Sequence, residues 1–147
     1  MKAIILAAGR GSRMGDLTEE FPKCRQKLHG KELIQWQMDA ITEAGISEIG
    51  LVRGYMADTF DLPIRYFENY RWNQTNMVSS LMAADSWLEK DLCITSYSDI
   101  VYSSDAIRRL IESNGNIVIT YDPNWQELWT SRFTNPLEDA GNISNRW

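Results

Sequence analysis

Three glycines near the amino terminus, Gly9, Gly11 and Gly15, stand where a chain could bind phosphate groups. Glycine has no Cβ atom, so the backbone can turn tightly and bring successive N–H groups up to phosphate oxygens. Two basic residues, Arg13 and Lys23, follow within the same stretch. Arginine grips phosphate through a planar fork of donors and lysine acts as a compact point charge. Together these residues predict binding of a polyphosphate whose charge grows during reaction.

Two familiar glycine-rich motifs do not fit this stretch. A P-loop ends in Gly-Lys followed by Ser or Thr, and that ending is missing from the sequence. The dinucleotide pattern Gly-x-Gly-x-x-Gly fails because Met14 stands at its last glycine. An oxidoreductase that uses a nicotinamide cofactor is therefore disfavoured. The glycines taken alone would fit an ordinary turn after a strand equally well.

The elements around the glycines predict an α/β fold. Residues 3–7 form a short apolar run before the first glycine, typical of a strand buried on both faces of a parallel sheet. Strands separated by about a dozen helical residues are typical of βαβ units. Apolar spacing predicts further strands at 49–52, 64–67, 92–95 and 116–120, and helices over 33–44 (stopped by Gly45), 76–88 and from 103 or 104 to 111. No linker or repeat interrupts the pattern, so one domain over residues 1–147 is expected.

The segment beyond Tyr121 shows no clean period, because Pro123 and Pro136 bracket its aromatic residues. It is expected to be irregular, either packed on the sheet or bordering the pocket of a second substrate.

Composition narrows the class of partner. The chain has 147 residues, 44% of them hydrophobic, and a net charge of −5. A nucleic-acid or anionic-membrane surface needs clustered lysine and arginine in excess, so a small-molecule partner is expected instead. The apolar run after Lys2 is too short for a signal peptide, and no segment reaches membrane-spanning length. Cys24 and Cys93 show neither disulfide nor metal spacing, which favours a reduced cytoplasm.

A longer pattern resembles the signature of the nucleotidyltransferases that activate sugar phosphates and related phosphorylated metabolites. It reads Leu6-Ala7-Ala8-Gly9-x-Gly11-x-Arg13-Met14, then Thr18, then Pro22-Lys23. The resemblance implies a three-layer αβα, Rossmann-like, mostly parallel sheet of the nucleotide-diphospho-sugar transferase type. It also implies catalytic roles for Lys23 and Arg13. The residues expected to bind the nucleotide are Leu6, Ala7, Ala8, Gly9, Gly11, Ser12, Arg13, Lys23, Gln74, Thr75, Asn76 and Ser80.

Two segments, 75–80 and 98–100, most resemble the cytidylyltransferases that act on phosphocholine, aminoethylphosphonate and similar compounds. Gln74 or Asn76 carries both a donor and an acceptor and could read a pyrimidine edge. Asn76 could equally cap the helix that follows it, and the two roles are compatible. Tyr55 could line the base pocket or simply pack. The choice of CTP over UTP or another NTP stays open, as does a sugar-1-phosphate nucleotidyltransferase.

Asp99 is the candidate metal ligand. It follows the apolar run 92–95, at the carboxyl end of the inferred sheet, where ligands bind in open α/β folds. It also matches the metal-binding aspartate of the resembled family, which implies Mg²⁺ as cofactor. Mg²⁺ needs only one or two protein carboxylates because substrate phosphates and water complete its shell. The family's second acidic ligand comes from a later strand and has no counterpart here; Asp122 and Asp139 are not assigned to that role.

The resemblance thus implies Mg²⁺-dependent cytidylyl transfer from CTP to a small phosphorylated or phosphonate acceptor, with release of pyrophosphate. Family-like sequence runs to about residue 140, so a truncated domain carrying the nucleotide-binding portion is expected. A nucleotide-binding fragment without turnover is therefore the main alternative. A homodimer is compatible with this interpretation.

Overall fold

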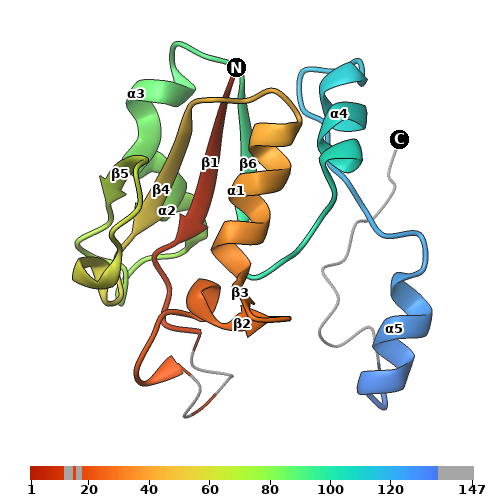
Figure 1. The fold of residues 1–147 in the computed structure, drawn as a ribbon, viewed down its shortest axis with the longest axis horizontal. Helices are drawn as coiled ribbons and strands as arrows, with labels where there is room; N and C mark the ends of the chain where they lie inside the picture. Colours follow the sequence, from red (N-terminus) through yellow and green to blue (C-terminus); the bar gives the residue numbers. More distant parts are fainter. Residues whose placement is uncertain (12–14, 16–17, 136–147) are drawn as a thin grey trace. The chain divides into compact units, whose positions relative to one another are not determined.

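A computed structural model of the chain describes residues 1–11, 15 and 18–135 (Figure 1). The chain divides into two compact units, Met1–Ile111 and Glu112–Trp147. The expectation of one domain over residues 1–147 stays a prediction. None of the helices in the described part of the chain has the length and apolarity that a membrane span requires.

The first unit is built on a four-stranded parallel sheet with the order β5-β4-β1-β6. Its strands are β1 (Lys2–Ala7), β4 (Ile49–Arg53), β5 (Arg65–Glu68) and β6 (Cys93–Tyr97). Ala3 pairs with Ile49 on one side and with Ile94 on the other, so β1 is a central strand. The four predicted strands of this unit are confirmed, although β6 continues to Tyr97 rather than ending at Thr95.

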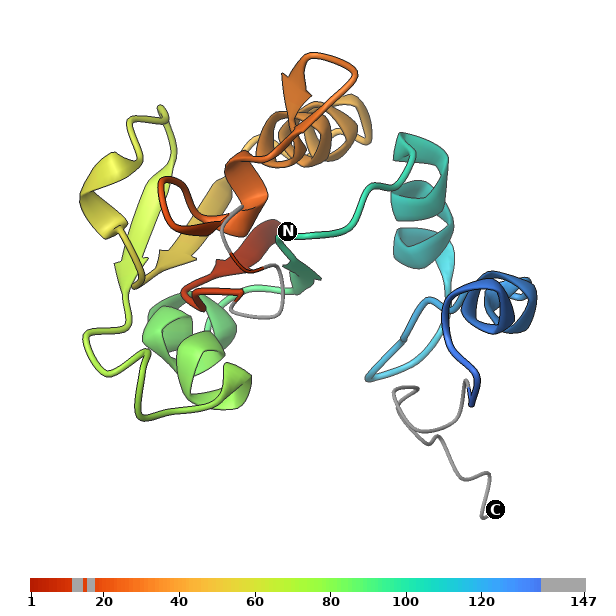
Figure 2. The same ribbon diagram turned by 90° about the horizontal axis from the view of Figure 1, so that it is seen from below.

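Alternate residues of β1 point to opposite faces of the sheet, as the two-residue period of a strand requires. Ala3 and Ile5 belong to one buried cluster, which includes Ile34 and Ile41 of α1 (Leu33–Glu43). Ile4 belongs to a second cluster on the other face, with Ala84. Figure 2 shows the sheet between α1 on one side and the green helical segments on the other. The predicted three-layer, mostly parallel Rossmann-like architecture is confirmed.

The helix predictions for this unit are confirmed in part. Helix α1 ends as expected, because Gly45 adopts φ +94°, which favours glycine. Helix α4 (Ser104–Glu112) also forms as predicted. A short hairpin of β2 (Lys27–Leu28) and β3 (Lys31–Glu32) lies before α1.

The single helix predicted over 76–88 is wrong. The segment is divided into α2 (Met77–Leu81), the 3-10 turn η4 (Met82–Ala84) and α3 (Asp85–Leu88). The regular turn breaks at Ala84, whose φ of −101° and ψ of 23° lie outside helical values. The apolar residues of this segment therefore do not share one buried face, since Ala84 is fully buried while Met77 is 53% exposed.

Two predictions for the second unit are also wrong. Residues 116–120 form no strand, and Ile117 and Ile119 are 86% and 73% exposed. A strand needs a hydrogen-bonded neighbour, and no partner strand for this segment is found in the described part of the chain. The segment after Pro123, expected to be irregular, contains helix α5 (Trp125–Arg132). Its position beside a second-substrate pocket stays a prediction.

Candidate functional site

The candidate site lies at the carboxyl ends of β1 and β6. The chain passes from β1 to β4 and β5 on one side of the sheet, and β6 is then added on the other side of β1. The connections therefore change direction between β1 and β6. Open α/β sheets bind ligands outside the carboxyl ends of the strands at such a switch point. The glycine-rich loop leaves β1 there, and Asp99 follows β6.

The structure brings Lys23 and Asp99 together at this point. Lys23 Nζ donates a hydrogen bond of 2.6 Å to Asp99 Oδ2, and about a third of each side chain is exposed. The stem of Lys23 packs against Gly11, whose φ is +70°. A Cβ atom on Gly11 would lie 3.3 Å from both Cβ and Cδ of Lys23. The glycine therefore allows the lysine to lie along the loop with its ammonium group at the strand ends.

The first part of the predicted loop is also placed at this edge. Leu6 and Ala7 are the last residues of β1, and Ala8 is buried directly after them. Gly9 is exposed, and a Cβ atom built on it would meet no atom within 4 Å. The backbone at Gly9 is thus open to a ligand. The predictions for Ser12 and Arg13 lie outside the described residues.

Tyr55 holds the backbone on both sides of this loop. Its N–H donates to the carbonyl of Ala8 at 2.9 Å, and its hydroxyl donates to the carbonyl of Thr18 at 3.0 Å. The Tyr55 ring also packs edge-on against Trp72, with 5.3 Å between the ring centroids. Of the two roles considered from the sequence, packing is the one that the structure shows.

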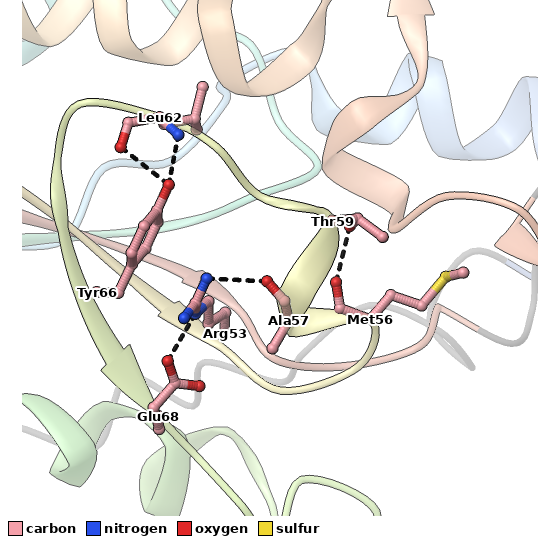
Figure 3. Close-up of polar contacts among 7 residues, drawn as sticks. All are labelled: Arg53, Met56, Ala57, Thr59, Leu62, Tyr66 and Glu68. Carbon is pink, nitrogen blue, oxygen red and sulfur yellow. Dashed lines mark hydrogen bonds and ion pairs between the residues drawn. The ribbon is translucent and has the colours of Figure 1, made fainter.

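The segment that carries Tyr55 is fixed by a network around Arg53, the last residue of β4 (Figure 3). Its guanidinium donates to Glu68 at 2.6 Å and to the carbonyl of Ala57 at 2.9 Å. Met56, which lies between Arg53 and Ala57 in the chain, adopts a left-handed φ of +49°. Such a conformation is unfavourable for a residue with a side chain, so the surrounding bonds must hold it. A polar cavity of about 410 Å³ borders this network, and Gly54, one of its lining residues, lies close to the Ala8 carbonyl oxygen.

The predicted base-recognition residues lie before and within α2. Asn76 caps the helix, because its side-chain oxygen accepts the N–H of Ser79 at 3.1 Å. Ser80 is buried, and its hydroxyl accepts a hydrogen bond from Asn69 at 2.9 Å. Thr75 accepts a second bond from Asn69 at 3.0 Å, whereas Gln74 is exposed. In the described part of the chain no hydrogen bond joins these residues to Lys23, so a role in base binding stays a prediction.

Asp99 is the residue best placed to hold a cation. Within residues 1–11, 15 and 18–135, no three His, Cys, Asp or Glu side chains gather into a metal-binding group. A single partly exposed carboxylate at the strand ends still fits Mg²⁺, which keeps water and takes substrate phosphate oxygens. The role of Asp99 as a ligand stays a prediction.

Cys24 is adjacent to Lys23 but differs from it in character. Burial raises the pKa of its thiol to about 12, from an ordinary 9.0. The thiol is therefore protonated at neutral pH and packs as a small apolar group in the core around α1. The structure thus gives Cys24 a role in packing.

The sequence did not predict the hydrogen bonds of Tyr55 and Gln37. The hydroxyl bond of Tyr55 crosses 37 positions of the chain, a distance at which no local pattern operates. Gln37 lies within the helix predicted over 33–44, yet its side chain bonds to the segment that carries Asp99. The available signal for Gln37 was a polar residue at a position where the helical spacing predicts the core.

Comparisons with known proteins find several cytidylyltransferases similar to this chain. The curated CTP:phosphoglutamine cytidylyltransferase of Campylobacter jejuni is 40% identical over 95% of this chain and 60% of its own length. The 2-aminoethylphosphonate cytidylyltransferase of Lancefieldella rimae is 35% identical over 71% of this chain and 45% of its own length. A solved CTP:phosphocholine cytidylyltransferase from Streptococcus pneumoniae superposes with a TM-score of 0.64 at 31% identity, covering 71% of this chain and 49% of that one.

The chain thus spans about half the length of the relatives that it matches. A nucleotidyl transferase from Methanothermobacter gives a TM-score of 0.61 at 27% identity. The family profile for the MobA-like NTP transferase domain matches residues 3–138, which includes the glycine-rich loop, Lys23 and Asp99. On that match, and on the sheet and loop described above, this chain belongs to the MobA-like NTP transferase domain family.

Proposed function

We propose that the chain carries the nucleotide-binding portion of a cytidylyltransferase, which transfers a cytidylyl group from CTP to a small phosphorylated or phosphonate acceptor. The observation that carries the proposal is the 2.6 Å contact between Lys23 and Asp99 at the switch point of the sheet. It joins the cation expected to bind phosphate to the carboxylate expected to hold a metal. CTP is the favoured nucleotide because relatives at 40%, 35% and 31% identity are named as cytidylyltransferases.

The proposed reaction is a direct displacement at the α-phosphorus of CTP. An acceptor oxygen forms a bond to the α-phosphorus as the bond to the β-phosphate bridging oxygen breaks, and pyrophosphate leaves. The acceptor oxygen already carries negative charge, so no proton has to be removed. His29, the single histidine of the sequence, is exposed in the turn between β2 and β3 and is not needed.

The protein groups would act by positioning and by charge. Backbone N–H groups at Gly9 and Gly11 would contact phosphate oxygens, and Lys23 would neutralise the charge that builds on the leaving pyrophosphate. Asp99 would hold Mg²⁺, which when bound shields phosphate charge and orients the oxygens for in-line attack. Lys23 and Asp99 neutralise each other in the present structure, so nucleotide and metal would each take one partner of an existing pair.

The first test is binding of CTP, UTP, ATP and GTP to this chain, each with and without Mg²⁺, followed by thermal shift. A ligand at about 100 times its Kd stabilises the folded state by roughly 2.7 kcal/mol. We expect CTP with Mg²⁺ to give the largest shift. Equal shifts with all four nucleotides would contradict pyrimidine selection, and a folded chain that responds to none of them would overturn the proposal.

The second test is pyrophosphate release from CTP with three acceptors: phosphocholine, 2-aminoethylphosphonate and phosphoglutamine. Release that depends on one acceptor would establish transfer and identify the acceptor class. Selective CTP binding without release for any acceptor would favour the alternative, a nucleotide-binding portion that does not turn over by itself.

A further inference from the structure

Gln37 is a fully buried polar residue in the middle of α1. Its side-chain nitrogen donates to the carbonyl of Tyr97 at 2.9 Å and to the carbonyl of Ile100 at 2.5 Å. Both neighbours are acceptors, so the amide must turn its nitrogen, with its two hydrogens, toward them. The two carbonyls lie on either side of Asp99 in the chain. Gln37 therefore closes the turn that presents Asp99.

The glutamine at this position carries a cost for stability as well as a gain. Its Oε1 atom is the only buried side-chain oxygen or nitrogen in the described part of the chain that has no hydrogen-bond partner. A buried polar atom without a partner is destabilising. An apolar side chain of similar length would avoid that penalty, but it would leave the Tyr97 and Ile100 carbonyls without this donor. The residue keeps an unfavourable oxygen in the core, and what it gains is two bonds to the turn around Asp99.

We propose that Gln37 is a positioning residue, which fixes the turn from Tyr97 to Ile100 so that the Asp99 carboxylate lies at the end of β1 beside Lys23. Ser96 adds a bond to the Tyr97 carbonyl at 2.9 Å, but among the residues that the structure describes only Gln37 bonds on both sides of the aspartate. The part of the proposal that concerns metal and nucleotide rests on the proposed function. The part that concerns the geometry of Asp99 does not.

The geometry is tested without any ligand by a carbodiimide, which joins an amine and a carboxylate only when they are in contact. Lys23 and Asp99 should be cross-linked in the wild-type chain, and mass spectrometry measures the yield. The Lys2–Asp91 pair, at 3.1 Å and at the other end of the sheet, is an internal control. In Gln37→Met, which keeps the length and removes the donor, we expect the Lys23–Asp99 yield to fall at least fivefold and the Lys2–Asp91 yield to stay the same.

An unchanged Lys23–Asp99 yield in folded Gln37→Met would overturn the proposal. If that variant also loses the control cross-link and is therefore unfolded, the proposal is tested in the wild-type chain instead. Scalar couplings across hydrogen bonds, from the Gln37 side-chain nitrogen to the carbonyl carbons of Tyr97 and Ile100, should be measurable by NMR. Their absence would overturn the proposal by itself. Ile41→Val, in the same buried face of α1, controls for a general loss of packing.

The link to function is tested by CTP affinity with and without Mg²⁺. We expect Gln37→Met and Asp99→Asn each to reduce the Mg²⁺-dependent gain in affinity about tenfold, and Gln37→Met to change metal-free binding by less than twofold. In the Asp99→Asn background Gln37→Met should add almost nothing. An equal loss in both backgrounds would show that Gln37 does not act through Asp99. If the wild-type chain binds no nucleotide, the proposed function fails while the cross-linking result still decides the role of Gln37.

Discussion

The ammonium group of Lys23 lies 2.6 Å from a carboxylate oxygen of Asp99, although 76 positions of sequence separate the two residues. Lys23 follows the glycine-rich loop and Asp99 follows β6, so the contact joins the two strand ends between which the sheet changes direction. Each charge is the counter-ion of the other. A triphosphate with its metal would offer Lys23 an anion and Asp99 a cation, so this pair can be exchanged without leaving either charge unpaired.

Lys23→Ala should therefore weaken nucleotide binding much more than it lowers the stability of the fold. A partly exposed ion pair contributes about 1 kcal/mol or less, so the free energy of unfolding should fall by no more than that. Loss of a charge-assisted contact to phosphate should weaken CTP binding at least tenfold. Isothermal calorimetry and urea unfolding measure the two quantities. Lys27→Ala, an exposed lysine in β2, removes the same charge and should leave affinity unchanged. Equal affinities for the two variants would remove Lys23 from the site.

Gly9, in the loop after β1, and Gly54, directly after β4, should respond differently to alanine. At Gly9 a Cβ atom meets no atom within 4 Å, so Gly9→Ala should change unfolding free energy by less than about 0.5 kcal/mol. It should still weaken CTP binding about tenfold, because the new methyl group occupies the space into which the phosphate must come. Wild-type affinity in this variant would show that the ligand does not approach the backbone at Gly9.

At Gly54 a Cβ atom would lie 2.6 Å from Trp72 Cβ and 3.0 Å from the Ala8 carbonyl oxygen. Gly54→Ala should therefore lower the unfolding free energy by about 1–3 kcal/mol, the usual range for overpacking. Chemical denaturation measures the change. A variant as stable as the wild type would mean that Trp72 moves aside without strain.

The sequence predicted the parts of this fold that have local causes. Periodicity gives α1 and the four strands, and the left-handed φ of Gly45 explains where α1 ends. The longer loop signature pointed to Lys23, and the position of Asp99 after an apolar run, with its match to the family's aspartate, pointed to Asp99; the roles of both stay predictions. Residues 116–120 have the composition of a strand but remain exposed, since composition does not supply a hydrogen-bonded neighbour. The contacts of Gln37 and Tyr55 cross 60 and 37 positions, so they depend on tertiary structure and no spacing rule could find them.

Substitutions of Asn76 should distinguish its cap from a contact with the base. Asn76→Ala removes the acceptor for the Ser79 N–H and should destabilise the chain by about 1 kcal/mol. Asn76→Asp keeps an acceptor at the cap and removes the amide donor. If the donor reads the cytosine edge, the aspartate variant should keep wild-type stability and lose at least tenfold in CTP affinity. Wild-type affinity in the aspartate variant would leave the cap as the only role of the residue.

The buried thiol of Cys24 should make stability fall at alkaline pH. Burial raises its pKa to about 12 in the folded chain, whereas the unfolded chain loses the same proton near the ordinary value of 9.0. The unfolded state thus binds fewer protons above pH 9, and the folded state becomes less stable as pH rises from there toward 12. The thiol should account for a loss of about 1–2 kcal/mol between pH 9 and pH 10.5.

Cys24→Ala isolates this contribution, because it removes the titrating group and leaves the other alkaline groups in place. Its free energy of unfolding should lie below that of the wild type at pH 7, since a small cavity replaces the sulfur in the core. The difference in unfolding free energy between the two proteins should become smaller above pH 9, because only the wild type carries the thiol and loses this stability. Urea unfolding of both proteins at several pH values between 7 and 10.5 measures it. A constant difference across that range would mean that the thiol reaches solvent in the folded chain.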